Sequence, residues 1–591
     1  MKLYYSVIFF IISSLGFSQF NYQRDWATYY FGNAAYCADS KLDNNGNLYV
    51  TGFVKIYNNS TFYEAYTSSN AYQTFVGGGL TDAFLAKFSP EGILLWCTYY
   101  GGNEIDCGNR LAFDSNGNVY LVGHTRSISG IATSGAFLTT IPTYLSCFMA
   151  KFNSSGTRIW GTYFYGTIYD ISINNNDEIF IGGYTNNTTN VATDNVFQQI
   201  AITGNPNTAD ANWNCYINKF DIQGNRILGT YCGKTMSGVG GIGEIDPYSR
   251  EFCLKTDQNN NIIIVGLAYA DSTNSFASLG CFKPYHSGES DMFISKFNSD
   301  LSERLWSTYY GGEGNEDIGE IIIDNTDIYI TGVTTSNTEI ASPGAFIQTK
   351  TGSLSNGLLC KFDTNGNRQW STYFGGIRSR GNGIAVKNDK LYVVGQSRGL
   401  TQNINITTSG AYQEDYLGSE EGFFAEFNAT TGMRNWCSYY GGSLMDIICS
   451  VKIGNENQLY LTGNTTSATN ISTAGSLQPN GNFTQGAFQT VPYNLFIAKF
   501  IYNPLGITNN PTSQFEVFPN PSNGIFQILV NQYHEKLDVE IYDLNGRLVH
   551  LSQNQDFQNQ RIIDISNLQS GVYLLKAKNE KINFTQKIIK N

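Results

Sequence analysis

The sequence predicts an all-β protein in two parts, a long region of repeated units and a shorter C-terminal β domain. The first observation is a word of the form Trp-x-Thr-Tyr-Tyr-x-Gly, whose recurrence at a nearly fixed spacing indicates a repeat architecture. The second is that a turn and alternating apolar residues follow each copy, with no helical period. The seven copies begin at Trp26, Trp96, Trp160, Leu228, Trp306, Trp370 and Trp436.

Each repeat contains the same further words, and the second repeat shows them clearly. Asn116 and Gly117 precede the apolar segment 119–123, and Asn-Gly before alternating apolar residues is the strongest short hairpin signal. A Gly-Ala-Phe word follows at 135–137, and a word related to Phe-x-Ala-Lys-Phe at 148–152. Together with the Trp-Tyr-Tyr word, these segments predict four short strands in every repeat, joined by long polar loops.

Four-stranded units repeated around an axis are typical of a β-propeller, so we expect a seven-bladed ring in residues 19–503. The chain opens with the last strand of a repeat at 24–30, and the repeats end with the preceding strand at 495–500. We therefore expect the N-terminal strand to complete the final blade, with Tyr29 and Phe496 in one sheet. Closure of this kind removes exposed strand edges.

Three words of the sequence resemble the bacterial β-propeller repeat (SBBP repeat) family: W-C-T-Y-Y-G-G at 96–102, N-G-N-V-Y-L-V-G at 116–123 and F-L-A-K-F at 84–88. The resemblance extends over residues 24–500 and implies the propeller fold. The fourth repeat departs most from the pattern, because Leu228 replaces Trp and Cys232 replaces Tyr.

The repeated Trp and Tyr residues have two interpretations. Apolar residues are nearly continuous in the segments 84–88 and 119–122, as expected for strands buried on both faces between neighbouring blades. Most of the repeated aromatic residues are therefore predicted to pack between blades. For the copies near the loops, an aromatic platform on which sugars stack is the alternative.

The first residues of the chain predict an export signal. Lys2 precedes a short apolar run at 6–15, and small residues at 16 and 18 suit cleavage between Ser18 and Gln19. No other segment of the sequence reaches the length of a transmembrane helix. We expect residues 1–18 to be removed, and the mature protein to be exported and soluble or held at a surface by other means.

The charge of the chain lies in the repeats. The formal net charge is −12, whereas acidic and basic residues balance in the segment 515–591. An acidic surface disfavours nucleic acid and anionic membranes, because both attract basic surfaces.

The eleven cysteines cannot all pair within the chain, because their number is odd. Cys147, Cys281 and Cys360 occupy positions where other repeats have small residues, which predicts small buried side chains there. Export to an oxidising compartment leaves disulfides open for two pairs, each within a single repeat: Cys97 with Cys107, and Cys437 with Cys449.

A second β domain follows a polar linker at 504–514. Alternating strands between Gly and Asn turns in residues 515–591 predict a small Ig-like sandwich. Four words closely resemble the C-terminal type A sorting domain of the type IX secretion system: F-P-N-P-S-N-G, D-L-N-G-R, L-Q-S-G-V-Y and K-I-I-K. The resemblance rests on Pro519, Asn520, Pro521, Gly524, Asn545, Gly546, Gly571, Tyr573 and Lys587.

This resemblance implies the type IX machinery as a partner. It implies translocation across the outer membrane, cleavage of the tail, and then release or attachment to surface lipopolysaccharide. A generic Ig-like adhesion module is the alternative that the residues alone leave open. The expected localisation is secreted or cell-surface.

No cluster in the sequence predicts catalysis, a cofactor or a metal. There is no Gly-x-Ser-x-Gly elbow and no phosphate-binding loop. No metal-ligand spacing exists among the four histidines, His124, His286, His534 and His550. His124 varies among the repeats, which predicts a loop position.

Two sets of acidic residues recur near turns. Those near the Gly-Gly turns are expected to cap or bond the turns, with paired glycosidase carboxylates as the alternative: Asp106, Asp170, Asp317 and Asp446. Those in Asp-x-x-Gly-Asn turns lack the bidentate Glu of a calcium loop, so turn chemistry is predicted over calcium: Asp43, Asp114, Asp221 and Asp363.

The long loops are expected to share one face of the propeller with the Gly-Gly turns. Their polar and aromatic content favours sugars or proteins as ligands: residues 57–79, 185–213 and 464–494. We therefore predict a non-catalytic, monomeric binding protein for a glycan or protein partner, with a role in recognition or adhesion. A structural surface-layer component and an extracellular polysaccharide-acting hydrolase or lyase are the alternatives.

Overall fold

The chain separates into two parts, which we call the repeat region and the tail domain. The repeat region contains residues Arg24–Phe500, and the tail domain contains residues Ile501–Asn591. Their described elements are β-strands. The computed structural model describes residues 20–31, 35–56, 66–142, 146–203, 213–234, 250–269, 275–398, 406–481, 493–503, 515–518, 520, 522–530, 536–544, 546–556, 560–578 and 583–591.

Seven four-stranded sheets make up the described repeat region, and in six of them the strands follow chain order from one edge to the other. The first three sheets are β2 (Ala35–Leu42), β3 (Leu48–Lys55), β4 (Thr81–Phe88) and β5 (Leu94–Tyr100); β6 (Asp106–Phe113), β7 (Val119–Thr125), β8 (Ser146–Phe152) and β9 (Arg158–Tyr165); and β10 (Asp170–Ile173), β11 (Ile179–Thr185), β12 (Asn214–Phe220) and β13 (Arg226–Lys234).

The next three sheets have the same antiparallel order. They are β14 (Phe252–Thr256), β15 (Ile262–Tyr269), β16 (Ser290–Phe297) and β17 (Arg304–Tyr310); β18 (Glu316–Asp324), β19 (Asp327–Thr334), β20 (Asn356–Asp363) and β21 (Arg368–Phe374); and β22 (Arg380–Lys387), β23 (Lys390–Ser397), β24 (Glu421–Asn428) and β25 (Arg434–Tyr440).

The seventh sheet joins the two ends of the repeat region. Its order is β26 (Asp446–Ile453), β27 (Leu459–Thr465), β28 (Asn494–Tyr502) and β1 (Tyr22–Tyr30). The N-terminal strand therefore occupies the outer position of the last sheet, which places Tyr29 and Phe496 in one sheet. Asn503 N donates a further hydrogen bond to Asn21 O at 2.6 Å.

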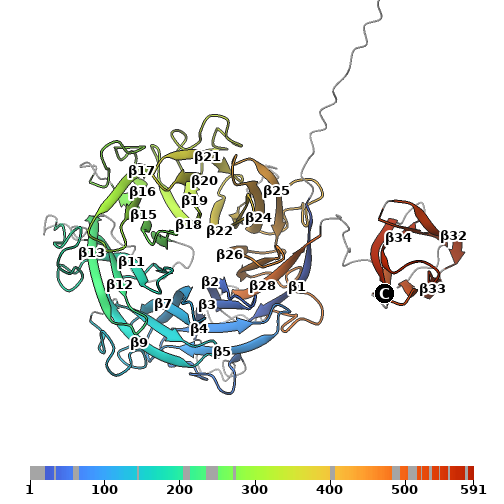
Figure 1. Cartoon of the computed structure of the whole chain (residues 1–591), viewed down its shortest axis with the longest axis horizontal. Coiled ribbons are helices and arrows are strands. Elements are labelled where there is room, and N and C mark those ends of the chain that lie inside the picture. The colour runs from blue at the N-terminus through green and yellow to red at the C-terminus, as the bar shows by residue number, and fades with distance from the viewer. Residues whose placement is uncertain are drawn as a thin grey trace, which may run out of the picture. The chain divides into compact units, whose positions relative to one another are not determined.

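The sheets follow one another around a common centre (Figure 1). The labelled strands β2, β18, β22 and β26 lie nearest this centre, and β5, β9, β13, β17, β21 and β25 lie at the rim. The first strand of each sheet contacts the first strand of the next, and β26 contacts β2. We call these first strands the inner strands.

The repeated Trp residues pack between neighbouring sheets. Trp96 is buried, and its Nε1 donates to Ser154 O at 3.0 Å in the turn between the last two strands of the next sheet. A Cβ added at Gly156 in that turn would lie 2.9 Å from the Trp96 ring, so only glycine fits there. Trp26, Trp160, Trp306 and Trp370 donate in the same way to Pro90, Ile222, Thr364 and Ala429. This confirms the predicted packing role.

The segments with the Gly-Ala-Phe word lie along the outer strand of their own sheet. In the first sheet Ser68 N donates to Cys97 O, and Tyr99 N donates to Gln73 O, both at 3.0 Å. The other six sheets each have the same two backbone bonds. Much of each long loop therefore covers a strand edge that would otherwise be open to association.

The tail domain consists of two sheets that share one core. Buried Phe526 and Ile528 of the first sheet pack with Val539, Ile541 and Leu575 of the second. The sheets are β29 (Phe515–Phe518), β30 (Ile525–Val530) and β33 (Gln560–Asp564), and β32 (Leu548–Asp556), β31 (Lys536–Tyr542), β34 (Gly571–Lys578) and β35 (Asn583–Lys590).

Candidate functional site

Asn520, in the first segment of the predicted sorting motif, hydrogen-bonds to the last strand of the tail domain. Asn520 Nδ2 donates to Lys587 O at 2.7 Å, and Asn520 Oδ1 accepts a hydrogen bond from Ile589 N at 2.8 Å. Both partners lie in β35. The side chain of Asn520 therefore replaces a strand neighbour at this point of the domain.

The other described motif residues shape turns and strand ends. Gly524 and Gly546 have φ of +109° and +78°, a region that favours glycine. Gly571 begins β34, and the hydroxyl of Tyr573 donates to a backbone carbonyl at 2.7 Å. Five predicted residues lie outside the described ones: Ser18, Gln19, Pro519, Pro521 and Asn545.

His124 lies inside strand β7, although its variability among the repeats predicts a loop. Its Nδ1 is 3.2 Å from Cys147 Sγ. Burial, together with the charges of Arg110 and Arg126, lowers the pKa of His124 to about 4, which leaves the ring neutral at pH 7. Within the described ranges, no group of three or more His, Cys, Asp or Glu side chains could hold a metal ion.

The Asp-x-x-Gly-Asn turns are closed by their own hydrogen bonds. Asp114 Oδ1 accepts bonds from Asn116 N at 3.1 Å and Asn118 N at 2.9 Å, and its Oδ2 pairs with Lys151 Nζ at 2.9 Å. Burial raises the pKa of Asp114, but bonds from Asn118 and Lys151 outweigh burial and lower it below its usual value. The carboxylate is therefore satisfied by turn chemistry.

At the opposite end of the sheets, carboxyl groups lie beneath the Gly-Gly turns. Asp106 Oδ2 accepts bonds from Gly102 N and Ser127 Oγ, both at 2.7 Å. Asp446 makes the equivalent bond to Gly442 N at 2.7 Å. The equivalent residue in the fifth sheet is Glu316, which accepts from Gly312 N at 2.9 Å. The turn-bonding role predicted for Asp106 and Asp446 is confirmed.

Asp170 and Asp317 do not belong to this set, which corrects their predicted equivalence. Asp170 pairs with Lys255 Nζ at 2.6 Å on the inner strands. Asp317 forms an ion pair with Arg380 on the next inner strand at 2.5 Å. Asp317 is one residue beyond Glu316, and a shift of one residue moves a strand side chain to the other face.

Each of these turn-bonding residues has a second carboxyl group beside it. The pairs are Asp82 with Asp106, Asp291 with Glu316, and Glu421 with Asp446. A Cβ added at Gly101 would lie 2.1 Å from Asp82 Oδ1 and 2.8 Å from Asp106 Oδ2, so both oxygens crowd the same glycine. Gly311 and Gly441 stand in the same relation to the other two pairs.

These pairs keep a proton. Burial, followed by the charge of Asp106, raises the pKa of Asp82 to about 8. Burial raises the pKa of Asp106 to about 6. In the last pair, burial and the charge of Asp446 raise the pKa of Glu421 to about 8. Two adjacent buried carboxyl groups cannot both ionise at low cost, so one proton remains between them near neutral pH.

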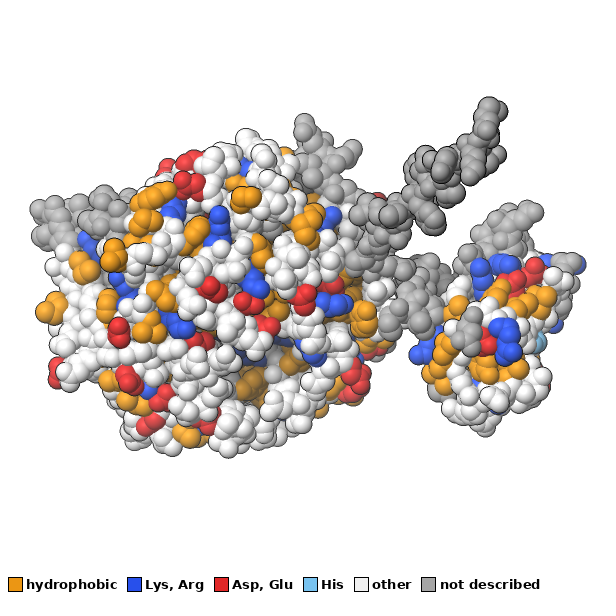
Figure 2. Space-filling view, turned by 45° about the horizontal axis from the view of Figure 1, so that its top comes forward, with side chains coloured by type: hydrophobic (Ala, Val, Ile, Leu, Met, Phe, Trp, Pro, Cys, Tyr) orange, Lys and Arg blue, Asp and Glu red, His pale blue; other side chains and the backbone are white. Residues whose placement is uncertain are grey.

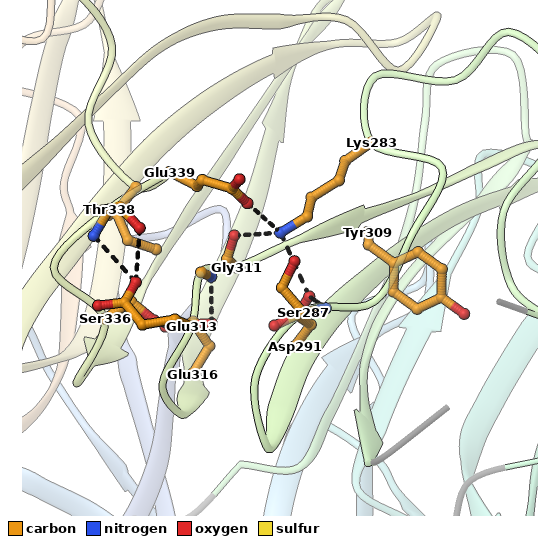
Figure 3. A network of polar contacts seen from close by, with 12 residues as sticks. Lys283, Ser287, Asp291, Tyr309, Gly311, Glu313, Glu316, Ser336, Thr338 and Glu339 are labelled. Atoms are coloured by element: carbon orange, nitrogen blue, oxygen red, sulfur yellow. Dashed lines mark hydrogen bonds and ion pairs between the residues drawn. The ribbon is translucent and has the colours of Figure 1, made fainter. Parts of the chain in front are cut away.

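The middle pair has a lysine beside it (Figure 3). Lys283 Nζ donates to Gly311 O at 2.6 Å and to Glu339 Oε2 at 2.8 Å, and it lies 3.6 Å from Asp291 Oδ2. In the other two junctions the equivalent residue is a glutamine, whose Oε1 accepts a bond from the turn glycine: Gln73 and Gln413. All three carboxyl pairs are buried, which places them within the junctions between sheets.

A different set of charges lies on the inner strands, and it varies from sheet to sheet. Asp39, Arg110 and Glu320 occupy equivalent positions, directly after a β-bulge in β2, β6 and β18. A bulge re-aims the following side chain. The next two sheets have Gly383 and Ser450 at this position. The side chain at this position therefore differs from sheet to sheet.

The carboxylates of this set bridge neighbouring inner strands. Asp39 Oδ2 accepts a bond from Leu111 N at 3.1 Å, and Asp170 Oδ2 accepts one from Leu254 N at 2.9 Å. Glu320 makes the third such bond, to a main-chain N–H of β22. Positive side chains surround them. Arg250 lies 3.4 Å from Glu320 Oε1, and Lys452 on β26 lies 3.8 Å from the same oxygen.

Eight charged residues on the inner strands, or directly before them, act on one another electrostatically, and we call them the axial cluster: Asp39, Lys41, Arg110, Asp170, Arg250, Lys255, Glu320 and Lys452. Five of them are basic and three are acidic, although the chain as a whole is acidic. Lys255 and Lys452 keep 22% and 19% of their side-chain surface exposed, so solvent reaches the cluster.

The pKa directions follow from this excess of positive charge. Burial raises the pKa of Glu320, but the charges of Lys452 and Arg250 outweigh burial and lower it to about 2. Burial, then the charge of Lys255, lowers the pKa of Lys41. Lys41 forms no ion pair with any residue in the described part of the chain. The cluster therefore favours an additional negative charge.

No sequence motif predicts the axial cluster. Its residues are far apart in the chain and belong to different repeats. A local signal is limited to Asp39 and Lys41, which stand at alternate positions of β2. Elsewhere charges are dispersed, and the face of the repeat region in Figure 2 shows acidic, basic and apolar side chains interspersed.

Comparison with known families identifies both parts of the chain. Residues 516–591 match the Secretion system C-terminal sorting domain, and residues 95–128 match the Beta-propeller repeat. The type IX sorting domain indicates a secreted or cell-surface protein. The described residues contain no helix that is long and apolar enough to span a membrane.

Similarity to individual proteins is weaker. Regulatory protein FlaEY of Caulobacter vibrioides is 24% identical over 287 residues, which cover 44% of this chain and 26% of that protein. A carbohydrate-active enzyme of family AA12 from Trichoderma reesei aligns with a TM-score of 0.30 at 9% identity, covering 82% of this chain and 99% of that one. Xylan beta-1,4-xylosidase of Bacillus halodurans aligns with a TM-score of 0.23 at 8% identity, and the alignment covers 71% of this chain and 88% of that one.

Proposed function

We propose that this protein is an exported β-propeller that binds an anionic ligand at the axial cluster, after delivery by the type IX machinery. The observation that carries the proposal is the excess of basic over acidic side chains within the axial cluster, with Lys41 unpaired among the described residues. In this proposal the sorting domain directs export, and the axial cluster binds the anion.

The proposed architecture is a seven-bladed ring closed by the N-terminal strand. Support comes from the pairing of β1 with β28 and from the contacts that run through consecutive inner strands and return from β26 to β2. A ring of this kind brings charges from distant repeats to one axis. The tail domain is proposed to be an Ig-like sandwich, on the basis of its two sheets and shared core.

The ligand class that suits the cluster is an acidic glycan bearing carboxylate or sulfate groups. Guanidinium and ammonium groups bind such anions through charge-assisted hydrogen bonds. Arg110 and Arg250 offer forked donors, and Lys41, Lys255 and Lys452 offer point charges. Several basic groups on separate strands suit a ligand with more than one negative charge.

A binding role is supported over hydrolysis by the state of the carboxyl groups. A glycosidase needs a protonated acid that reaches the substrate, next to an ionised carboxylate. Positive neighbours lower the pKa of Asp170 and Glu320, although burial opposes them, so both are ionised at pH 7. The carboxyl pairs with raised pKa, such as Asp82 with Asp106, are buried beneath the Gly-Gly turns, and Glu251, whose pKa burial raises to about 7, accepts a hydrogen bond from the Tyr169 hydroxyl at 3.2 Å.

Binding of the mature protein to arrays of neutral, uronate-bearing and sulfated glycans tests the proposal. Lys41→Gln is the decisive variant, because removing an unpaired, half-buried cation beside Lys255 relieves repulsion and should leave the melting temperature unchanged or higher. We expect a loss of affinity of about tenfold, the equivalent of one charge-assisted hydrogen bond. Lys390→Gln removes the same charge from the start of β23, outside the cluster, where Lys390 pairs with Glu426 at 3.4 Å, and it should have no effect on binding.

Selective binding of acidic glycans that Lys41→Gln weakens would support the proposal. Equal binding of neutral glycans, or binding that Lys41→Gln leaves intact, would contradict it. A folded protein that binds no glycan would favour the alternative of a structural surface component.

The sorting role has a separate test. Deletion of residues 515–591 should leave the repeat region inside the cell envelope, because the machinery recognises the tail. The measurement is the amount of protein in the medium and on intact cells, compared with the full chain. Undiminished appearance outside the cell would contradict the role.

A further inference from the structure

The seam between the first and last sheets is the place where the repeat region closes. Strand β2 contacts β26 and β27 there. The residues that meet at the seam form one buried cluster, which includes Cys37 of β2 and Cys449 of β26. Both cysteines are buried, with exposed fractions of 0% and 4%. All eleven cysteines are thiols in this structure.

The two cysteines of the seam meet at a single side chain, the amide of Asn464. Asn464 of β27 holds them in place from one side. Its Oδ1 accepts a bond from Cys37 N at 2.8 Å, and its Nδ2 donates to Cys449 Sγ at 3.3 Å. The same amide is 3.4 Å from Cys37 O, so one side chain contacts both cysteines.

The position of Cys449 explains why it reaches across the seam. Cys449 is the bulge residue of β26, between Ile448 and Ser450. The bulge residues of other inner strands also reach the next sheet, because Asn109 donates to Ile168 O and Asn382 donates to Ile448 O. At the seam this bridging position holds a cysteine, and the residue it meets is a second cysteine.

We propose that Cys37 and Cys449 form a disulfide in the exported protein, which locks the last sheet to the first. The sorting domain directs the chain out of the cytosol, into compartments where disulfides persist. We propose this pairing in place of the pairs considered from the sequence, since Cys107 Sγ lies 3.3 Å from Thr81 Oγ1 on β4. Cys437 packs in a different cluster from Cys449.

The reaction needs an external disulfide as oxidant, of the kind that thiol–disulfide oxidoreductases carry. The thiolate of one cysteine attacks that disulfide, releases one oxidant sulfur as a thiol and forms a mixed disulfide. The second cysteine then displaces the other sulfur, so that two protons and two electrons pass to the oxidant. Burial raises the pKa of Cys449, so we expect the exchange while the seam is still open during folding.

A second pair of cysteines provides a matched comparison. Cys215 and Cys232 are also in contact, but they lie on β12 and β13, which are neighbouring strands of one sheet. A bond between them would close a short loop within a sheet that is already hydrogen-bonded. A bond between Cys37 and Cys449 would close a loop of nearly the whole repeat region, and longer loops restrict the unfolded chain more.

The test begins with mature protein collected outside the cell, alkylated before and after reduction, and digested for mass spectrometry. We expect a peptide in which Cys37 and Cys449 are joined. We also expect reduction to lower the melting temperature of the wild type by about 4 °C, from a loop-entropy change of several kcal/mol in a domain of this size. The variant Cys37→Ser/Cys449→Ser should not respond to reduction.

Recovery of Cys37 and Cys449 as alkylated free thiols in exported, folded protein would overturn the proposal. So would an equal response to reduction in the wild type and in Cys37→Ser/Cys449→Ser. The variant Cys215→Ser/Cys232→Ser keeps the seam intact and should retain the full response. If Cys37→Ser/Cys449→Ser fails to fold, the peptide map of the wild type decides the matter by itself.

Discussion

The two ends of each sheet accommodate buried carboxyl groups in opposite ways. At the Asp-x-x-Gly-Asn turns, Asp114 is ionised and pairs with Lys151 at 2.9 Å. At the Gly-Gly turns, burial raises the pKa of Asp82 to about 8 and that of Asp106 to about 6, so Asp82 keeps its proton at pH 7. A buried carboxylate is therefore neutralised by a lysine at the Asp-x-x-Gly-Asn turns and by protonation at the Gly-Gly turns.

The difference has opposite consequences for stability. The pKa of Asp114 is lowered, so its contribution is present above the usual value near 3.8 and is lost as the pH falls through the folded-state pKa. The pKa of Asp82 is raised to about 8, so its contribution is present below 3.8 and is lost as the pH rises through about 8. Stability should therefore decline on both the acid and the alkaline side, with different residues responsible.

The largest effect is expected from breaking a lysine pair. Lys151→Met leaves the carboxylate of Asp114 buried and without its cation, which should cost about 3 kcal/mol. Urea unfolding at pH 7 measures the loss. Lys361→Met is the matched control, because its partner Asp327 keeps 32% of its side-chain surface exposed, whereas Asp114 keeps none. Equal losses in the two variants would show that burial does not decide the cost.

The next effect tests whether the carboxyl pairs require the Gly-Gly turns. Gly101→Ala places a Cβ 2.1 Å from Asp82 Oδ1, so the pair must separate, at a cost of about 2 kcal/mol. Gly117→Ala is the control, because nothing lies within 4 Å of its added Cβ and only its φ of +75° opposes the change. That strain should cost about 1 kcal/mol. Thermal unfolding at pH 7 compares them, and a larger loss in Gly117→Ala would refute the crowding.

The sequence predicted the parts of this comparison that are local. The Trp motifs, the hairpin turns and the strand order depend on residues that are close together in the sequence, and the structure has all three as predicted. The Asp-x-x-Gly-Asn turns are equally local, since Asp114 is satisfied mainly by Asn116 and Asn118. Turn chemistry of this kind can be inferred from residue types alone.

Contacts between sheets could not be predicted in the same way. Asp106 was identified, but its partner Asp82 lies in another sheet, and no pattern joins the two. Glu316 was missed in favour of Asp317, because the register of a strand decides which of two adjacent acids faces the turn. The axial cluster was missed for a related reason, since Lys41, Lys255 and Lys452 approach one another only when distant repeats meet at the axis.

A third prediction concerns the shared proton. Asp82→Asn replaces the protonated carboxyl with an amide that can donate to Asp106 without titrating. Other sheets already have Asn at this position: Asn214, Asn356 and Asn494. We expect little change at pH 5 and a gain of about 1 kcal/mol at pH 9, roughly one pKa unit of relieved titration. Unfolding across this pH range measures it, and a uniform loss would contradict a shared proton.

The smallest effect should come from the junction that combines both solutions. Lys283→Gln gives the middle pair the glutamine found in the other two junctions, and it removes the ion pair with Glu339, which is 45% exposed. Surface pairs contribute little, so the loss at pH 7 should stay below about 1 kcal/mol. Without the ammonium, the pKa of the pair Asp291 and Glu316 should rise, and the alkaline loss of stability should move to higher pH. An alkaline transition that stays at the same pH would mean that Lys283 does not act on the pair, and the junction would then depend on the proton alone.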